Sequence, residues 1–428
     1  MITMAIDNKD KKVLKSSIER EQNEVACSAE CEKIKGSKNL NVPHLRFPEF
    51  SGEWKEEQLD SIATLSKGIG ISKEQLSEDG EPCILYGELY TKYKSEIIKH
   101  VESKTDIDSS KLKRSKANDV IIPCSGETAV DIATARCVPF DNILLGGDLN
   151  VISLHKYDGA FMSYQLNGKR KYDIARVAQG VSVVHLYGEH LKAIKTYNPS
   201  LPEQQKIAEL LSLIDERIAT QNKIIKKYES LIKGISNLLL YETEGKSVCL
   251  GDILIERSER TQTNNQYDVL SSTVKGIFSQ REYFSKDIAS ENNVGYKIIR
   301  LHDIVLSPQN LWMGNINYND KFDIGIVSPS YKIFSIGEGY DKRFVAAMLK
   351  THRALYNYIL VSEQGASIVR RNLNMEAFSQ LVFKLPTFDK QRKIGYAISS
   401  LKSQLEAANK IVRAYISQKQ YLLRQMFI

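Results

Sequence analysis

Residues that could form a catalytic site are scarce in this sequence. A nucleotide-dependent enzyme would carry a glycine-rich loop, either G-x-G-x-x-G after a strand or G-x-x-x-x-G-K-[ST] before a helix, and neither pattern occurs. The paired carboxylates Glu56-Glu57 and Asp215-Glu216 fit solvated helix or loop faces better than a general acid–base pair. We therefore expect that the chain is not an enzyme and holds no cofactor of its own.

Metal-ligating residues are equally sparse. Cys27 and Cys31 have no second ligand pair nearby, and His185 and His190 flank Gly188 in a predicted turn, which is more typical of surface histidines than of a metal site. The six cysteines are scattered without a framework, which favours reduced thiols and a cytoplasmic location. We expect no metal. No stretch approaches the length of a membrane span, and no secretory signal is visible, so no membrane association is expected.

Side chains suited to nucleic-acid binding are more frequent. The formal net charge of +7 permits binding to a polyanion without requiring it. In the first half of the chain, aromatic residues alternate with lysines, and basic clusters follow. Basic side chains position a protein on DNA phosphates, whereas polar side chains in loops can contact base edges. The candidate DNA-binding residues here are Tyr86, Tyr90, Lys92, Lys94, Lys113, Arg114, Lys116, Ser125, Thr128, Lys169, Arg170 and Lys171.

In the second half, basic residues are spaced through predicted loops, and a glutamine–asparagine pair follows a strand candidate. A side-chain amide can make a bidentate contact with adenine in the major groove. Any one of these charges could equally be a solubilising surface group, but the set favours phosphate positioning combined with base readout. The candidates are Arg257, Arg260, Lys275, Arg281, Gln309 and Asn310.

The element that must position these residues is a long helix predicted from Ser200 to Tyr241. Its apolar residues alternate in steps of four and three, which is the seam of a coiled coil. Ser200 and Glu203 form a capping-box pattern, with Pro202 in the first turn. At 1.5 Å per residue the helix is roughly 60 Å long, so it needs a partner. The seam residues are Ile207, Leu211, Ile214, Ile218, Ile225, Tyr228 and Ile232.

The partner is in the same chain, because the pattern recurs between Gln391 and Met426, where Gln391 matches Gln204. The second seam comprises Ile394, Ile398, Leu401, Leu405, Val412, Tyr415 and Leu422. Lys419 occupies the position that corresponds to Ile232 in the first copy. Antiparallel pairing is our inference, and the sequence alone leaves parallel pairing open.

The segments upstream of the two helices are also related. Asn118-Asp119-Val120-Ile121 corresponds to His302-Asp303-Ile304-Val305, and residues 179–184 match 364–369. Strands are predicted at 119–123 and 149–154, and a short helix at 161–179. The predicted fold class is α+β, with two globular domains of mixed α/β structure separated by two long helices that form an intramolecular antiparallel coiled coil. The predicted divisions are a mobile arm at 1–40, a first domain at 41–199, a long helix at 200–243, a second domain at 244–386 and a second long helix at 387–428.

Several of these segments resemble the specificity (S) subunits of type I restriction–modification systems. The resemblance lies in NVPHLRFPEFSGEW at 41–54, the Leu-Pro-Glu-Gln helix start with its heptads at 201–234, and a weaker copy at 385–427. GGDLNVISL and GVSVVHL in the first domain also fit, so that about residues 41–428 are covered. Two departures are residues 1–38, which extend beyond the usual start, and Thr387-Phe388-Asp389-Lys390, which replaces the proline–Glu–Gln start of the second helix.

The resemblance implies two target recognition domains that each read one half of a bipartite, asymmetric site in double-stranded DNA, with the helices setting the spacer. It implies two methyltransferase (M) and two restriction (R) subunits as partners, which would carry S-adenosylmethionine, ATP and Mg²⁺. The altered second helix start bears on whether both helices bind M subunits equally. Two alternatives remain: an S-like subunit of a system with a fused nuclease–methyltransferase, and a coiled-coil adaptor that binds proteins without contacting DNA.

Overall fold

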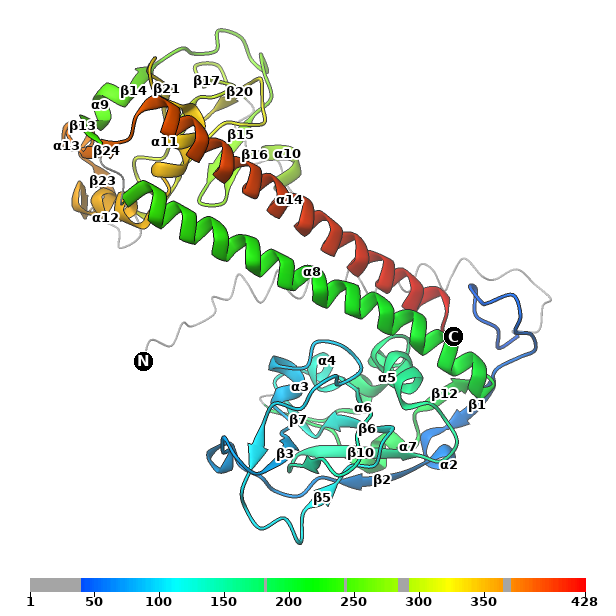
Figure 1. Cartoon of the computed structure of the whole chain (residues 1–428). Helices are drawn as coiled ribbons and strands as arrows, with labels where there is room; N and C mark the ends of the chain where they lie inside the picture. Colours follow the sequence, from blue (N-terminus) through cyan, green and yellow to red (C-terminus); the bar gives the residue numbers. More distant parts are fainter. Residues whose placement is uncertain (1–39, 181–182, 242–244, 284–291, 365–370) are drawn as a thin grey trace. The chain divides into compact units, whose positions relative to one another are not determined.

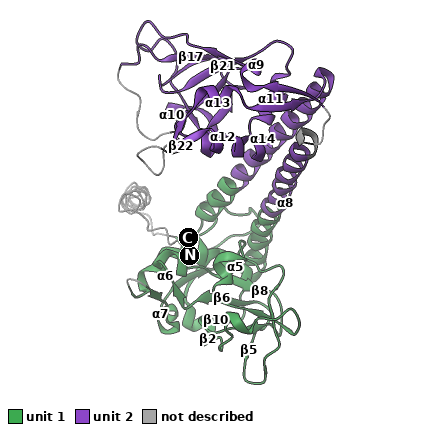
Figure 2. Cartoon of the chain, turned by 90° about the vertical axis from the view of Figure 1, so that its left-hand side faces the viewer, with its two compact units in different colours: residues 1–216, 416–428 green, residues 217–415 purple. Residues whose placement is uncertain are grey.

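A computed structural model describes residues 40–180, 183–241, 245–283, 292–364 and 371–428 (Figure 1). The predicted N-terminal arm, apart from Leu40, and most of the 364–369 repeat therefore lie outside the described residues. The chain forms two compact units (Figure 2): unit 1 comprises residues 1–216 and 416–428, and unit 2 comprises residues 217–415. Both boundaries fall inside the long helices α8 (Leu201–Tyr241) and α14 (Phe388–Gln425). Each unit consequently contains one end of each long helix.

Unit 1 is built around a four-stranded antiparallel sheet with the order β2-β10-β6-β8. The predicted strands at 119–123 and 149–154 are confirmed as β6 and β10. A second sheet has the order β4-β3-β9-β5, and β1-β12 and β7-β11 form two-stranded ribbons. The strands are β1 (Lys55–Gln58), β2 (Ala63–Lys67), β3 (Glu81–Ile84), β4 (Lys104–Thr105), β5 (Lys113–Arg114), β6 (Asp119–Pro123), β7 (Ser125–Gly126), β8 (Arg136–Val138), β9 (Leu144–Leu145), β10 (Leu149–Leu154), β11 (Val184–His185) and β12 (Lys195–Asn198).

Alternation along the central strands divides the core of unit 1 into two layers. Val120, Ile122 and Ile152 pack on one side of the sheet, whereas Ile121 and Val151 pack on the other, as the two-residue period of a strand requires. The first layer contacts α5, α6 and α7, and the second contacts α3 and β9. The short helices are α2 (Leu59–Ile62), η1 (Lys73–Gln75), α3 (Glu88–Thr91), α4 (Ala129–Ile132), α5 (Gly159–Asn167), α6 (Lys171–Val177) and α7 (Gly188–Lys192).

The helix predicted at 161–179 is two helices, because α5 ends before Gly168 and α6 begins at Lys171. The Gly168 N–H donates to the carbonyl of Tyr164, and a Cβ at this position would approach that carbonyl oxygen to 3.0 Å. The chain therefore turns at a residue where glycine fits the close approach.

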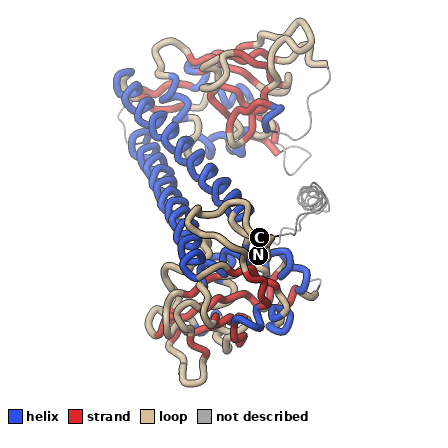
Figure 3. The backbone as a smooth tube through the Cα atoms, turned by 90° about the vertical axis from the view of Figure 1, so that its right-hand side faces the viewer, coloured by secondary structure: helices blue, strands red, loops and turns tan. Residues whose placement is uncertain are grey.

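Unit 2 repeats this frame with the sheet order β14-β21-β18-β19 and the ribbon β13-β24, which correspond to β2-β10-β6-β8 and β1-β12. The strands and helices of both units are distinguished in Figure 3. The strands of unit 2 are β13 (Lys246–Cys249), β14 (Leu254–Arg257), β15 (Leu270–Thr273), β16 (Gly276–Ser279), β17 (Lys297–Arg300), β18 (Ile304–Leu306), β19 (Ile316–Tyr318), β20 (Ile324–Val327), β21 (Lys332–Ile336), β22 (Ser362–Gln364), β23 (Arg371–Leu373) and β24 (Val382–Leu385). Its short helices are α9 (Leu250–Ile253), α10 (Gln280–Tyr283), η2 (Leu311–Met313), α11 (Lys342–Met348), α12 (His352–Leu360) and α13 (Met375–Ser379).

A buried glutamine joins the long helix to the backbone of neighbouring connecting segments in both units. In unit 1, Gln204 accepts from the backbone N–H of Asp158 at 2.9 Å and donates to the carbonyl of Pro199 at 2.8 Å. In unit 2, Gln391 accepts from the N–H of Asp341 at 3.1 Å and donates to the carbonyl of Pro386 at 2.9 Å. Asp158 and Asp341 in turn cap α5 and α11. The predicted duplication thus extends to individual hydrogen bonds.

The seam positions predicted from the heptads are the less exposed positions of both long helices. Every one of them is buried or half-buried in α8 and in α14. Within unit 2, the Arg217 guanidinium lies 5.9 Å from the ring of Tyr415, and Ile235 packs against the core that contains Ile394 and Ile398. Numbers rise along one helix while they fall along the other, so the segments that belong to unit 2 run antiparallel.

The start of α8 uses Glu203 differently from the predicted capping box. Glu203 is 1% exposed, and its carboxylate accepts from the Arg46 guanidinium at 2.7 and 2.8 Å and from the Trp54 indole at 3.3 Å. Trp54 in turn packs edge-on against Phe161 and Phe427. The lead-in segment before β1 is therefore fixed to α8 by a buried ion pair.

An ionic cluster lies in the seam of unit 1, and it corrects the interpretation of Asp215 as a solvated carboxylate. The Lys419 ammonium donates to Glu96 at 2.5 Å and to Asp215 at 2.6 Å, and the Tyr164 hydroxyl donates to Asp215 at 2.7 Å. Asp215 is 8% exposed. Burial, followed by the charge of Glu96, raises the pKa of Asp215 above its usual range. Lys419 replaces a seam isoleucine because two carboxylates here require a cation.

Candidate nucleic-acid interface

Polar and aromatic side chains gather at one edge of the main sheet in unit 1. Strand pairing sets Pro123 of β6 opposite Leu149 of β10, and Lys67 of β2 opposite Asn150 of β10. Strands β2 and β6 therefore end, and β10 begins, at the same edge. The loops that follow β2 and β6 come close together there.

A cluster at this edge, which we call the unit 1 edge cluster, comprises Lys67, Ser125, His185, Tyr187 and His190. Pairing of β7 with β11 sets His185 opposite Ser125, with 3.3 Å between the hydroxyl oxygen and Nδ1. The rings of His185 and Tyr187 stack with centroids 6.2 Å apart, and His190 meets Tyr187 edge-on at 5.7 Å. The Lys67 ammonium lies 5.7 Å from the Tyr187 centroid. Tyr187 nonetheless remains 45% exposed.

The edge cluster adjoins a hollow of about 550 Å³ whose lining includes Lys67, Gln179, Tyr187 and Lys192. An exposed aromatic ring offers a stacking surface to a base, a glutamine amide can hydrogen-bond a base edge, and lysines can neutralise phosphates. The arrangement can therefore hold a nucleotide by stacking and charge together.

Some of the residues predicted to bind DNA lie beside this cluster. The Tyr90 hydroxyl donates to the carbonyl of Ser125 at 2.9 Å, and burial raises the pKa of Tyr90, so its hydroxyl stays protonated. The Lys94 ammonium donates to the carbonyl of Tyr90 at 2.8 Å, and Thr128 caps α4 by accepting from the N–H of Asp131. Tyr86 is 37% exposed at the start of the same segment. Lys92 turns to Ser103 and Glu88 instead.

The other predicted residues of unit 1 lie elsewhere. Lys113 and Arg114 form β5 in the second sheet, and Lys116 precedes β6, at the opposite edge of the main sheet. Arg114 binds both oxygens of Glu81 at 2.6 and 3.0 Å, which lowers the pKa of Glu81 to about 2. Its charge is therefore already balanced by a carboxylate.

The basic run from Lys169 to Lys171 connects α5 to α6, on the side of the unit that faces the end of α14. The Arg170 guanidinium donates to the carbonyl of Ile428 at 3.1 Å and lies 5.3 Å from the ring of Tyr197. Burial lowers the pKa of Lys171. These contacts stabilise the packing of the run inside unit 1.

In unit 2 the equivalent edge carries a different set of side chains. Pairing of Leu306 with Lys332 places the loop after β18 at this edge, and that loop contains Gln309 and Asn310. The carbonyl of Gln309 accepts from the N–H of Arg371, whose guanidinium lies 4.8 Å from the ring of Trp312. Gln309 is exposed, and Asn310 is half-buried. We call Gln309, Asn310, Trp312 and Arg371 the unit 2 edge cluster.

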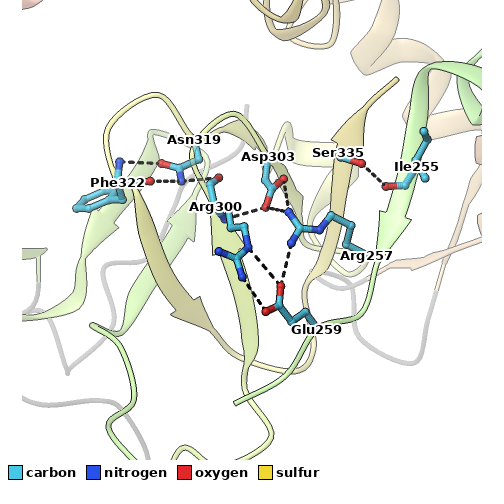
Figure 4. A network of polar contacts seen from close by, with 8 residues as sticks. All are labelled: Ile255, Arg257, Glu259, Arg300, Asp303, Asn319, Phe322 and Ser335. Carbon is cyan, nitrogen blue, oxygen red and sulfur yellow. Dashed lines mark hydrogen bonds and ion pairs between the residues drawn. The ribbon is translucent and has the colours of Figure 1, made fainter. Parts of the chain in front are cut away.

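The remaining predicted residues of unit 2 are divided between internal and exposed positions. Figure 4 shows Arg257 bound to both oxygens of Asp303 at 3.0 Å and to Glu259 at 2.9 Å, while Arg300 binds Glu259 at 2.8 Å. Arg260 donates to the carbonyl of Gly295. The exposed candidates are Arg260, Lys275, in the turn between β15 and β16, and Arg281, on α10.

Six residues of the two edge clusters were not among the sequence candidates for DNA binding: Lys67, His185, Tyr187, His190, Trp312 and Arg371. The basic clusters of the sequence lie elsewhere, whereas these six are single residues brought together by the fold. A detectable signal was the position of Ser125 and Gln309 immediately after corresponding strands. Among the described residues, no group of three metal-ligating side chains is close enough to hold an ion, and no helix is sufficiently long and apolar to cross a bilayer.

A comparison with known families relates part of the chain to one of them. Residues 51–230 match the model of the type I restriction modification DNA specificity domain. This segment of the chain is similar to that domain. The matched segment covers most of unit 1 and much of α8.

Solved structures extend the comparison to both units of the chain. The S subunit of a type I restriction–modification system from M. genitalium is 16% identical, with a TM-score of 0.60, over 90% of this chain and 99% of that one. A structure described as the basis of complex assembly and conformational transition of the type I R-M system is 13% identical, with a TM-score of 0.46, over 90% and 99%. The HsdS subunit from Thermoanaerobacter tengcongensis is 13% identical, with a TM-score of 0.38, over 90% and 98%. The first of these shows a shared fold.

Proposed function

We propose that this chain is a specificity subunit that directs a type I restriction–modification complex to a bipartite, asymmetric DNA site, with each unit reading one half-site. The observation that carries the proposal is the pair of edge clusters. Both occupy the same edge of the repeated sheet, yet Tyr187 and Lys67 in unit 1 are replaced by Trp312, Arg371 and Gln309 in unit 2. A common frame with different loop side chains suits two readers of different sequences.

The long helices set the spacer between the half-sites as an intramolecular antiparallel coiled coil. Support comes from the seam positions, which are the less exposed ones in both helices, and from the antiparallel contacts inside unit 2. A 41-residue helix is roughly 60 Å long, whereas half-sites one helical turn apart lie ~34 Å from each other. The length of the helices is therefore of the same order as the separation of two readers on neighbouring groove segments.

The partners in this proposal are double-stranded DNA, two M subunits and two R subunits, in the cytoplasm. S-adenosylmethionine, ATP and Mg²⁺ belong to those partners. A fused nuclease–methyltransferase could take the place of separate M and R chains, and the genes next to this one would distinguish the two arrangements.

The spacer is tested by inserting one heptad into both long helices at matched positions, after Glu216 in α8 and before Ile416 in α14. Each insertion lengthens its helix by about 10 Å, which corresponds to roughly three base pairs. Mapping of methylated sites in cells with the M subunit is expected to show both half-sites unchanged and the spacer longer by that amount. The control carries the heptad in α14 alone, which breaks the seam and should abolish methylation.

An unchanged spacer in the double insertion would exclude the helices as the ruler. The wider proposal has a separate test, retention of the chain and M subunit on duplex DNA at increasing salt concentration. Affinity is expected to fall steeply with salt, because phosphate contacts release counterions. A flat salt response would favour the adaptor that binds proteins without touching DNA.

A further inference from the structure

A hollow of about 360 Å³ lies in unit 2, at the seam of the long helices and beside the start of α12. It is lined in part by three lysines, Lys233 on α8, Lys350 before α12 and Lys402 on α14. Glu229 is the only carboxylate among its lining residues. The hollow therefore has an excess of positive charge.

The equivalent place in unit 1 is filled. The matched glutamines Gln204 and Gln391 align the long helices, so that Asp215 corresponds to Lys402 and Lys419 to Ile232. The matched caps of α5 and α11 align Tyr164 with Ala347. In unit 1 the Tyr164 ring and the Lys419 side chain occupy this volume.

The exchange of these three residues explains both the volume and the charge of the hollow. Alanine in place of tyrosine removes a ring, and Lys402 in place of Asp215 turns a carboxylate into an ammonium. In unit 1 the cation Lys419 is balanced by Glu96 and Asp215. No carboxylate of the described residues forms a comparable ion pair with Lys350 or Lys402.

The charges of the lysines around the hollow favour a bound anion. The Lys350 ammonium donates to the carbonyl of Gly314 at 2.8 Å, a neutral acceptor. Burial and the charge of Lys402 lower the pKa of Lys350 to about 8. Lys350 is half-buried, and Lys402 is exposed. Two neighbouring ammonium groups that repel each other are stabilised by an anion between them.

We propose that this hollow binds a phosphate-type oxyanion, held by Lys350 and Lys402 with Lys233 at the rim. A tetrahedral oxyanion has enough acceptor oxygens for several ammonium groups at once, and charge-assisted hydrogen bonds of this kind are strong. Its source is either a free phosphate compound or a phosphate of the DNA backbone. The inference does not depend on sequence-specific recognition, because the site can be measured without DNA.

Isothermal titration of the full-length chain with inorganic phosphate, at low ionic strength and in a phosphate-free buffer, tests the proposal. Wild-type protein is expected to bind one phosphate. Lys402→Asp, which introduces the unit 1 residue, should weaken that affinity about 10- to 100-fold, the range for a hydrogen bond between charged groups. Lys410→Ala is the matched control, because Lys410 is an exposed lysine of α14 outside the hollow. It should leave the affinity unchanged.

Ala347→Tyr provides a second, independent variant, since it fills the volume and leaves every lysine in place. It should also abolish binding, and circular dichroism would establish that each variant is folded. Absence of phosphate binding by the wild-type protein, or equal binding by folded Lys402→Asp and Ala347→Tyr variants, would overturn the proposal.

Retention on non-specific duplex DNA distinguishes the two sources. A salt dependence that weakens by about one unit of slope in Lys402→Asp assigns the site to a DNA phosphate. A salt dependence equal to that of the wild-type protein, together with phosphate binding by the free chain, assigns it to a small phosphate compound. Either result supports an oxyanion site.

Discussion

Units 1 and 2 can be compared at two places along the long helices. At the first, Gln204 and Gln391 make the same two hydrogen bonds to backbone atoms. Three turns further along each helix, Asp215 lies in a buried ionic cluster, whereas Lys402 lines a hollow. The glutamine hydrogen bonds are therefore the same in both units, whereas the side chains around Asp215 and Lys402 pack differently.

The difference shows which interactions constrain a duplicated frame. The glutamine bonds to an N–H and a carbonyl, which every pair of backbones supplies, so its role survives changes in the neighbouring side chains. The cluster of Lys419, Asp215 and Glu96 depends on side chains alone, and the loss of one partner leaves the others uncompensated. Such a group must change as a set, which explains why Asp215 and Lys419 both have different counterparts in unit 2, Lys402 and Ile232.

The largest expected effect comes from Lys419→Met, which removes the cation from two buried carboxylates. Unit 1 should lose about 3–5 kcal/mol of unfolding free energy, the usual cost of breaking a buried pair. Denaturant unfolding followed by Trp54 fluorescence in a Trp312→Phe background would report unit 1, because these are the two tryptophans of the chain. The loss should shrink as the pH falls from 8 to 5.

The direction of this pH dependence follows from linkage. Without Lys419, the pKa of Asp215, already raised by burial and by Glu96, rises further above its unfolded value. The native state then binds more protons than the unfolded state, so stability decreases as pH increases. Lys410→Met, at an exposed lysine, should change stability by less than about 0.5 kcal/mol. A loss that is independent of pH would contradict a charge-based role for Lys419.

A smaller loss of stability, similar in both units, is expected when the hydrogen bonds of Gln204 or Gln391 are removed. Gln204→Leu and Gln391→Leu each leave one N–H and one carbonyl without their partner, at a cost of about 1–3 kcal/mol. Unfolding of the two variants should show similar losses in unit 1 and unit 2, each measured by the tryptophan of that unit. A large loss of unfolding free energy in one unit and none in the other would show that the two glutamines are not equivalent.

The smallest effects concern the edge clusters. Tyr187→Ala is expected to relax the first half-site and Gln309→Ala the second, each by about 1–2 kcal/mol in discrimination, because a stacked ring or an amide contact is lost. Methylation-site mapping gives both half-sites together, so each variant serves as the control for the other. If both half-sites stayed intact in a variant, the substituted residue would not be a reader.

Periodicity made the repeat and the less exposed positions of the long helices predictable, because seam spacing is a local property of the sequence. The strands at 119–123 and 149–154 were predictable from their apolar runs for the same reason. Asp215 was misread because its partners Glu96 and Lys419 are distant in sequence. Tyr187 and Arg371 were not predicted, because strand pairing, and not sequence proximity, gives them their neighbours.

Unit 1 is discontinuous in the chain, and this has a consequence during protein synthesis. Its core includes Phe427, which packs on Trp54 and Phe161, and Met426 is buried beside it. At 5–20 residues per second, residues 217–428 leave the ribosome about 10–40 s after the first part of unit 1. During that interval Trp54 and Phe161 lack their cover. The unit that is made first is therefore completed last, and its open apolar face is the point at which a nascent chain is most exposed to aggregation or to a chaperone.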